Sequence, residues 1–179
     1  ATYIYQCRGR FVTDFAPIFQ QLYGTLCDNE MEQVTMQYVS HISRGDLKQQ
    51  LTSFREKERI VGYTLHGVHR DDLELFLNAY PIRQEGSQGQ TKTYFIALKL
   101  SQYIYLKERG NQRVPLLLLD DIFDKLDAGR VSRIIDYVSG DSFGQIFITD
   151  TNRDHLDGIL KSTTKDYKLF YVVDGQIME

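Results

Sequence analysis

Two adjacent carboxylates in the sequence have the chemistry to handle phosphates. Asp120 and Asp121 follow directly after the apolar run Leu116–Leu119. An uninterrupted apolar run predicts a strand buried on both faces, and open α/β sheets bind ligands at the carboxyl ends of their strands. One carboxylate there can hold a Mg²⁺ ion bound to phosphates, and the other can orient or deprotonate an attacking water. The alternative is a buried strand whose acids only meet solvent.

A turn of small and polar residues leads into an expected helix and forms a second candidate site. It consists of Gly86, Ser87, Gln88, Gly89 and Gln90. The N–H groups at a helix N-terminus and the positive end of the helix dipole attract anions, and the Ser87 hydroxyl adds a donor. An ordinary glycine-rich turn, in which Ser87 and Gln90 cap the helix, is the alternative.

The segment between the two acids and the next expected helix is a third candidate. Asp124, Lys125, Leu126 and Asp127 follow one another there, after Phe123. Asp127 is well placed to cap the helix, which is the simpler explanation of its presence. Capping and a functional role are compatible at one residue.

Two histidines and two acids lie close together, at His66, His69, Asp71 and Asp72. Imidazoles and carboxylates are metal ligands, but no second cluster in the sequence completes a tetrahedral site. A metal site is therefore disfavoured, and the spacing of these residues alone assigns them no role.

A basic cluster at Arg55, Lys57 and Arg59 alternates with Glu56 and Glu58. Opposite charges three and four residues apart on a helix stabilise a solvated face. The sequence therefore favours such a face over a contact with DNA.

Apolar periodicity predicts the elements that position these candidates. Phe15, Ile18, Phe19 and Leu22 have the spacing of one helix face, whereas strict alternation predicts strands. Apolar strands that alternate with helices predict a parallel sheet. The expected helices start at Asp14, after the N-cap Asp46, at 91–107 and around 131–138; the expected strands are 33–38, 116–119 and 145–149, with hairpins at 73–82 and 167–178.

The composition limits the class of protein. The 179 residues are 42% hydrophobic and 25% charged, which excludes collagen, a disulfide-stapled miniprotein and a disordered tail. The formal net charge of -3 gives no global basic field, so a DNA contact requires a local patch. No apolar run approaches the roughly 18 residues of a membrane span, and no membrane partner is expected.

The cysteines and the first residues favour a cytoplasmic location. Cys7 and Cys27 have neither the spacing of a zinc site nor that of a disulfide framework, so we expect reduced, buried thiols. The sequence begins at Ala1 without an initiator Met or a signal peptide. We interpret it as a fragment cut from a longer chain.

The order of these pieces resembles the C-terminal half of an ABC-type ATPase head. Within that class, His66–Asp72, Ser87–Gln90, Leu118–Asp121 and Gln145–Thr149 are similar to the RecF family of bacterial DNA replication and repair proteins. The resemblance extends across nearly the whole chain.

This resemblance implies an α/β fold in two parts. We expect a partial ABC-ATPase head, like a P-loop NTPase with part of its sheet missing, joined to a mixed α/β lobe. The lobe, with its hairpin, is expected at 1–85. The signature helix and the Walker B and D-loop half of the head are expected at 86–179.

The resemblance also implies roles for single residues. Asp120 matches the Walker B aspartate that holds Mg²⁺, Asp121 matches the catalytic carboxylate beside it, and Thr151 falls near the switch position. Two further sets match the signature motif, which reaches the ATP bound by the opposite subunit, and the D-loop, which crosses the dimer interface. They are Ser87, Gln88, Gly89 and Gln90 for the signature, and Lys125, Leu126 and Asp127 for the D-loop.

Three departures from the usual ABC pattern imply slow hydrolysis, suited to a switch more than a motor. Gly86 and Gln88 replace the first Leu and a Gly of the common Leu-Ser-Gly-Gly-Gln signature. Asp121 is one methylene shorter than the usual Glu, which pulls the base back from the water. Thr151 stands where most members have His, and it cannot act as a charged phosphate sensor.

The sequence lacks the phosphate cradle of a P-loop. The motif G-x-x-x-x-G-K-[ST] supplies the amides, the Lys and the metal-binding hydroxyl, and this sequence contains no Gly-Lys dipeptide. In the family that motif lies near the N-terminus of the full protein. The chain alone is therefore expected to be inactive, with ATP and Mg²⁺ bound stably only by the full-length protein.

For the full-length protein the resemblance implies ATP-dependent dimerisation, DNA binding at single-strand gaps and loading of recombinase. These activities belong to DNA replication, recombination, repair and the SOS response. Expected partners are single-stranded or gapped duplex DNA, a second copy of the protein, recombination mediator proteins and recombinase. Two alternatives stay open: the head of an SMC-like chromosome-organising ATPase, although no sustained heptad is present, and an ATP-inert interaction domain.

Overall fold

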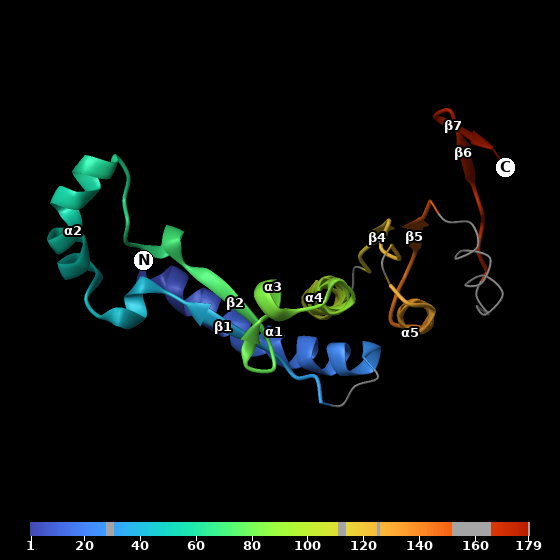
Figure 1. The fold of residues 1–179 in the computed structure, drawn as a ribbon, viewed down its shortest axis with the longest axis horizontal. Helices are drawn as coiled ribbons and strands as arrows, with labels where there is room; N and C mark the ends of the chain where they lie inside the picture. The colour runs from blue at the N-terminus through green and yellow to red at the C-terminus, as the bar shows by residue number, and fades with distance from the viewer. Residues whose placement is uncertain (28–30, 111–113, 125, 152–165, 179) are drawn as a thin grey trace.

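The chain folds as a mixed α/β protein with small sheets (Figure 1). A computed structural model describes residues 1–27, 31–110, 114–124, 126–151 and 166–178. The elements of the first part are α1 (Thr2–Leu26), β1 (Val34–Val39), η1 (His41–Arg44), α2 (Leu47–Val61), η2 (Val68–Arg70), β2 (Asp72–Leu77), β3 (Tyr80–Pro81) and α3 (Ile82–Glu85). Those of the second part are α4 (Gln88–Arg109), β4 (Leu117–Asp120), α5 (Ala128–Val138), β5 (Ile146–Thr149), β6 (Tyr171–Val173) and β7 (Gln176–Met178).

Two long helices, α1 and α4, form the centre of the hydrophobic core. Phe19 of α1 and Tyr94 of α4 are fully buried, with ring centroids 4.9 Å apart in an edge-to-face arrangement. Such aromatic pairs add about 0.5–1.5 kcal/mol beyond the area they bury. The helix predicted from Asp14 begins earlier, at Thr2. Its first turns are mostly exposed, and its buried residues begin at Phe15.

A three-stranded antiparallel sheet in the order β1, β2, β3 packs beside α1. β1 pairs with β2 from Val34 opposite Leu77 to Val39 opposite Asp72. The predicted turn after β2 is confirmed: Asn78 has a φ of 56°, and its side-chain oxygen accepts a hydrogen bond from the N–H of Gln33. Asn adopts this left-handed conformation more readily than most residues, so the turn is encoded locally.

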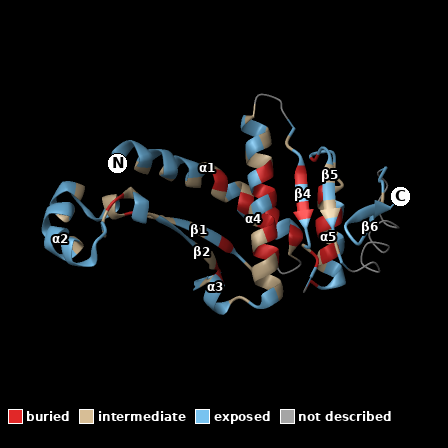
Figure 2. Cartoon of the chain, turned by 90° about the horizontal axis from the view of Figure 1, so that it is seen from above, coloured by how far each residue is buried: buried red, intermediate tan, exposed pale blue. Residues whose placement is uncertain are grey.

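The segment between β1 and β2 projects from the rest of the molecule and carries α2 at its tip (Figures 1 and 2). Asp46 caps α2 as predicted, since its carboxylate accepts a hydrogen bond from Gln49 N–H. Gly62 ends the helix with a φ of 80°, a conformation that favours glycine. No residue of α2 is buried, so local contacts hold this helix in place.

The second sheet pairs β4 with β5 in parallel, as the alternation of apolar strands and helices predicts. The expectation that β4 is buried on both faces is wrong. Leu117 and Leu119 are buried, but Leu116 is 61% exposed and Leu118 is 70% exposed. The described sheet has two strands, and the exposed leucines line an open groove of about 590 Å³ beside α4.

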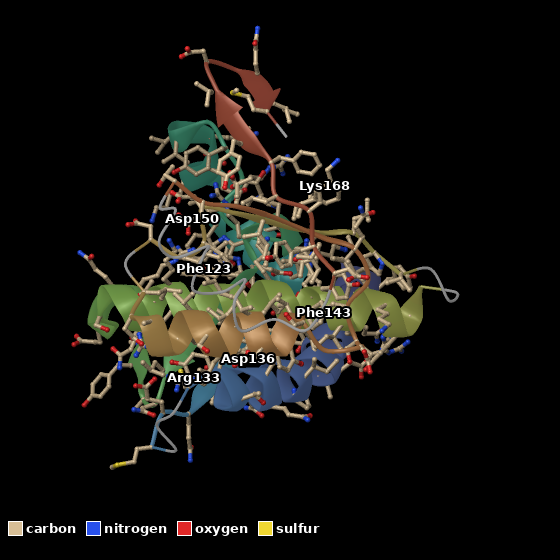
Figure 3. The ribbon with its side chains drawn as sticks, turned by 90° about the vertical axis from the view of Figure 1, so that its right-hand side faces the viewer. Phe123, Arg133, Asp136, Phe143, Asp150 and Lys168 are labelled. Carbon is tan, nitrogen blue, oxygen red and sulfur yellow. The ribbon has the colours of Figure 1, made fainter. Side chains whose placement is uncertain are left out.

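The helix α5 is amphipathic, and its four predicted core residues are all buried: Val131, Ile134, Ile135 and Val138. Phe123 and Phe143, labelled in Figure 3, are buried in the same core. Arg133 lies on the side of α5 toward α1 and donates a hydrogen bond to the carbonyl of Leu26 over 3.1 Å (Figure 3). This bond ties α5 to the end of α1.

The remaining predictions about the fold have mixed outcomes. The terminal hairpin turns at Asp174-Gly175 as predicted, but its first strand is shorter, Tyr171–Val173. Both cysteines are free, and Cys7 is exposed where burial was expected. Core residues of α1, α4 and α5 belong to one cluster, so the boundary expected between 85 and 86 divides a shared core and stays a prediction.

Candidate nucleotide-binding and dimerisation site

The two candidate acids stand at the carboxyl end of β4, beside the end of its parallel partner. Asp120 lies opposite Thr149 in the sheet register, and the Thr149 hydroxyl donates a hydrogen bond to the Asp120 carboxylate. The backbone N–H of Asp121 donates to the carbonyl and the hydroxyl of Thr149, each over 3.2 Å. Thr149 therefore orients both acids at this edge of the sheet.

The acids meet the requirements of a site for a hard cation. Asp120 and Asp121 are both exposed, and carboxylate oxygens are the ligands that Mg²⁺ prefers. An ionised carboxylate accepts several contacts, so the hydrogen bond from Thr149 leaves Asp120 with capacity for a metal. The residues present therefore fit a magnesium ion.

Asp121 has an unusual backbone, with a φ of 46°. This left-handed conformation is uncommon outside glycine, and such positions cluster at functional sites. The ammonium group of Lys92 donates to the carbonyl of Asp121 over 3.1 Å. Lys92 belongs to α4, so this contact links the first turns of that helix to the acidic edge of β4.

The turn before α4 is a complete helix cap. The Ser87 side chain accepts a hydrogen bond from Gln90 N–H, and the Gln90 side chain accepts one from Ser87 N–H. This reciprocal pair is a capping box. A Cβ at Gly86 would lie 2.7 Å from the Ile82 carbonyl and from the Thr91 hydroxyl, so only glycine fits there. Ser87 and Gln88 remain exposed at the tip of the turn.

Gln90 is anchored by a residue that the sequence did not indicate. Its side-chain amide donates to Glu32 over 3.0 Å, and the other oxygen of that carboxylate accepts from the hydroxyl of Tyr23 over 2.7 Å. Burial, together with the neighbouring Cys27 and Glu32, raises the pKa of Tyr23, so its hydroxyl stays a donor. The turn before α4 is thus tied to the core helix α1.

Replacing Glu32 with Ala is expected to lower the free energy of unfolding by about 1–3 kcal/mol, because the buried Tyr23 hydroxyl loses its acceptor. Urea unfolding measures this change. The matched variant carries Tyr23→Phe as well, which removes the unpaired donor and should restore part of the loss. A change of less than about 0.5 kcal/mol in the free energy of unfolding for Glu32→Ala would mean that the hydrogen bonds of Glu32 to Gln90 and Tyr23 do not contribute to stability.

The loop after the acids is held by its own contacts. Leu126 is buried and its N–H donates to the Phe123 carbonyl over 3.2 Å. Asp127 caps α5 as predicted, and the hydrogen bond from Arg130 N–H holds the pKa of its carboxyl below the ordinary value. Lys125 lies outside the described residues.

The structure brings some of the predicted site residues together and not others. Asp120 and Asp121 lie together, and Lys92 joins them to the helix that Ser87 begins. Thr151, at the predicted switch position, is exposed in the segment after β5. The rule that parallel strands end at one edge of a sheet could have indicated Thr149 from the sequence. Lys92 and Glu32 had no such signal, since one is an isolated lysine and the other precedes a strand.

The cluster of His66, His69, Asp71 and Asp72 makes contacts within the chain. Within the described ranges, no group of at least three His, Cys, Asp or Glu side chains is arranged to hold a metal ion. Asp71 instead accepts hydrogen bonds from Arg8, over 2.7 Å, and from Tyr38. Across the same described ranges, no helix has both the length and the hydrophobicity to cross a bilayer.

Comparison with known proteins decides the family. The chain is 52% identical over 176 residues to a DNA replication and repair protein RecF from Phocaeicola vulgatus, and 52% identical over 176 residues to the one from Bacteroides thetaiotaomicron. The chain belongs to the RecF family. Each match covers 98% of this chain and 47% of the relative, so the chain spans about half the length of these RecF proteins. No protein-family model matches the sequence.

Solved structures support the fold. A RecF structure described as "RecF-ATPrS in RecFOR pathway" matches with a TM-score of 0.70 at 24% identity, over 97% of this chain and 45% of that one. The corresponding "RecF-ATP" structure matches with a TM-score of 0.65 at 26% identity, over 84% of this chain and 41% of that one. An SMC ATPase matches at 0.57 and 15% identity, over 97% of this chain and 86% of that one, which shows the shared fold alone. Between the RecF and SMC alternatives, sequence identity favours RecF.

Proposed function

We propose that the chain is the signature and Walker B portion of an ATP-operated switch in DNA repair. The observation that carries this proposal is the arrangement of Asp120 and Asp121 at the end of β4, joined through Lys92 to the helix capped by Ser87. Its support also comes from the RecF relatives, whose printed names state DNA replication and repair.

Each residue has a distinct part in the proposed switch. Asp120 would hold Mg²⁺, which when bound would supply positive charge to the phosphates of ATP. Asp121 orients or deprotonates the attacking water, and its short side chain makes hydrolysis slow. Ser87, at the exposed tip of its turn, contacts the γ-phosphate of ATP bound by a second copy, together with Gln88, Gly89 and Gln90. Lys125, Leu126 and Asp127 form the D-loop at the same dimer interface, and Thr151 stands at the switch position.

ATP then controls the assembly of the full-length protein. A γ-phosphate held between two subunits binds only the closed dimer, so ATP shifts the population toward that dimer and hydrolysis releases it. We infer that the closed dimer binds DNA near single-strand gaps and helps mediator proteins load recombinase. The words "ATP-driven dimerization" in the description of the SMC structure support the analogy of mechanism.

The decisive experiment measures the mass of the full-length protein in solution with and without ATP and Mg²⁺. Light scattering should show a monomer without nucleotide and a dimer with ATP, and the dimer should bind a gapped duplex more tightly than the monomer does. If the measured mass is the same with and without ATP, the proposal is wrong. The 179-residue chain serves as a control, because without a G-x-x-x-x-G-K-[ST] motif it should not hydrolyse ATP.

One observation favours the alternative of an ATP-inert interaction domain. Ser87, Gln90 and Asp127 are all engaged as helix caps, so these residues have a structural use without any nucleotide. This alternative predicts that the full-length protein binds no ATP. Equilibrium dialysis with labelled ATP distinguishes the two candidates.

A further inference from the structure

The charge of the molecule is distributed unevenly. The projecting segment 41–70, which we name the basic arm, contains six Lys and Arg residues against three Asp and Glu residues. Its net charge is therefore +3, whereas the whole chain has a net charge of -3. The arm lies at the end of the molecule away from α4 and α5 (Figures 1 and 2). Because the whole chain is negatively charged, a contact with DNA requires a local positive field, and the arm provides one.

The arm's acids are all engaged in its own structure. Asp46 caps α2 through Gln49 N–H. Glu58 turns toward the loop after the helix, where it accepts a hydrogen bond from Leu65 N–H over 2.7 Å, and its side chain is only 15% exposed. The third acid, Glu56, forms an exposed ion pair over 3.1 Å with Arg59, three residues later in the helix. Of the two glutamates that alternate with the cations in the sequence, Glu58 is thus turned away from the surface, whereas Glu56 stays exposed beside Arg59.

Three of the four cations of α2 lie in a stripe along one face of the helix, together with Thr52. Lys48, Thr52, Arg55 and Arg59 follow one another at intervals of four, three and four residues, and all four are exposed. These intervals place side chains above one another on a helix, over a length of about 16 Å at 1.5 Å per residue. Among the residues that the structure describes, Lys48 and Arg55 make no ion pair. Lys57 lies on another side of the helix.

Ring contacts from Phe54, together with residues after α2, hold the arm in one arrangement. The ring of Phe54 lies 4.1 Å from that of His66, which in turn lies 4.8 Å from the ring of His41. Arg70 stacks over Tyr63 at 4.9 Å and donates to the carbonyl of Thr64. These contacts hold α2 in place while the stripe stays exposed, which limits the entropy lost when a partner binds.

We propose that the stripe of Lys48, Thr52, Arg55 and Arg59 binds the phosphate backbone of DNA. The stripe's charge complements a polyanion, its polar face suits a wet phosphate interface better than an apolar peptide, and the relatives' printed name states DNA replication and repair. This inference rests on the proposed function and deepens it, because it assigns a DNA-binding surface at a distance from the acids and the signature turn. Phosphate contacts position a protein without reading sequence, so binding through the stripe is sequence-independent.

The test compares two variants of the full-length protein that lose the same charge. One carries Lys48→Gln and Arg55→Gln in the stripe; the control carries Arg10→Gln in α1 and Lys57→Gln on another side of α2. Affinity for a gapped duplex is measured with ATP over a series of salt concentrations. The stripe variant should bind roughly tenfold more weakly, and its slope of log affinity against log salt should be shallower by about 1.8, for two lost phosphate contacts. The control should keep the original slope.

Dimerisation with ATP is measured on the same variants and should be unchanged in both. If the original protein dimerises and binds DNA but the two variants have equal affinity and equal slopes, the stripe proposal is wrong and the proposed function stands. If the original protein does not bind DNA at all, both fail. A stripe variant that loses dimerisation as well would show that the arm acts on assembly, and it would also overturn the proposal.

Discussion

Replacing Ser87 with Asp in the full-length protein is expected to weaken ATP-driven dimerisation by at least about a hundredfold. The structure makes this substitution informative because Ser87 is the N-cap of α4, and Asp is as good an N-cap as Ser. Helix stability should therefore be preserved. The new carboxylate, however, would face the γ-phosphate held by the second subunit, where like charges repel. Analytical ultracentrifugation with ATP measures the effect directly.

The control for this prediction is Ser87→Asn, which retains both the cap and neutrality. It should dimerise within a few-fold of the original protein, and thermal unfolding should place all three proteins within a few degrees of one another. If the Asp and Asn variants dimerise equally well, the contact across the interface does not exist. Ser87 would then be a cap alone, as the ATP-inert alternative requires.

Replacing Asp121 with Asn is expected to slow ATP hydrolysis by about 10²–10⁴-fold, the usual contribution of a general base. ATP binding and dimerisation should persist, because Asp120 and its hydrogen bond from Thr149 are untouched. The dimer should in consequence live longer after ATP is added. Single-turnover phosphate release and the decay of the dimer after dilution measure the two effects.

The matched control is Asp141→Asn, an exposed acid after α5 that has no assigned role. Its hydrolysis rate and dimer lifetime should equal those of the original protein. Asp121→Glu is informative in the other direction, since the added methylene brings the base closer to the water and should speed hydrolysis. An Asp121→Asn variant with an unchanged dimer lifetime would remove Asp121 from the catalytic role.

The sequence predicted the local elements well because their signals are local. Asp46, Ser87 and Asp127 were recognised as caps or potential caps, and each accepts the expected backbone hydrogen bond. The apolar period of α5 identified four buried residues, and the turn at Asn78 has the conformation that its residue type favours. Capping and periodicity depend on neighbours in sequence, so a single chain is sufficient to see them.

The features that sequence missed depend on contacts between distant segments. Leu118 looks like a buried residue in an apolar run, yet its burial depends on which elements cover that face of β4. Glu32 and Gln90 are far apart in the chain, as are Lys92 and Asp121, and no periodicity connects them. The role of Glu58 shows the same limit, because its turn toward Leu65 removes one acid from the exposed surface of α2 and no local pattern predicts that turn.

The way in which the arm joins the sheet also bears on how such proteins can diversify. β1 and β2 are paired through Val39 and Asp72, so the arm leaves and re-enters the molecule at adjacent points of one ladder. Loop-closure entropy grows slowly with length, at about 0.6 kcal/mol for each doubling. An arm of twice the length would therefore cost the fold little, and the register of β1 with β2 would be kept. The junction is therefore a point at which evolution can replace the arm while the rest of the fold stays the same.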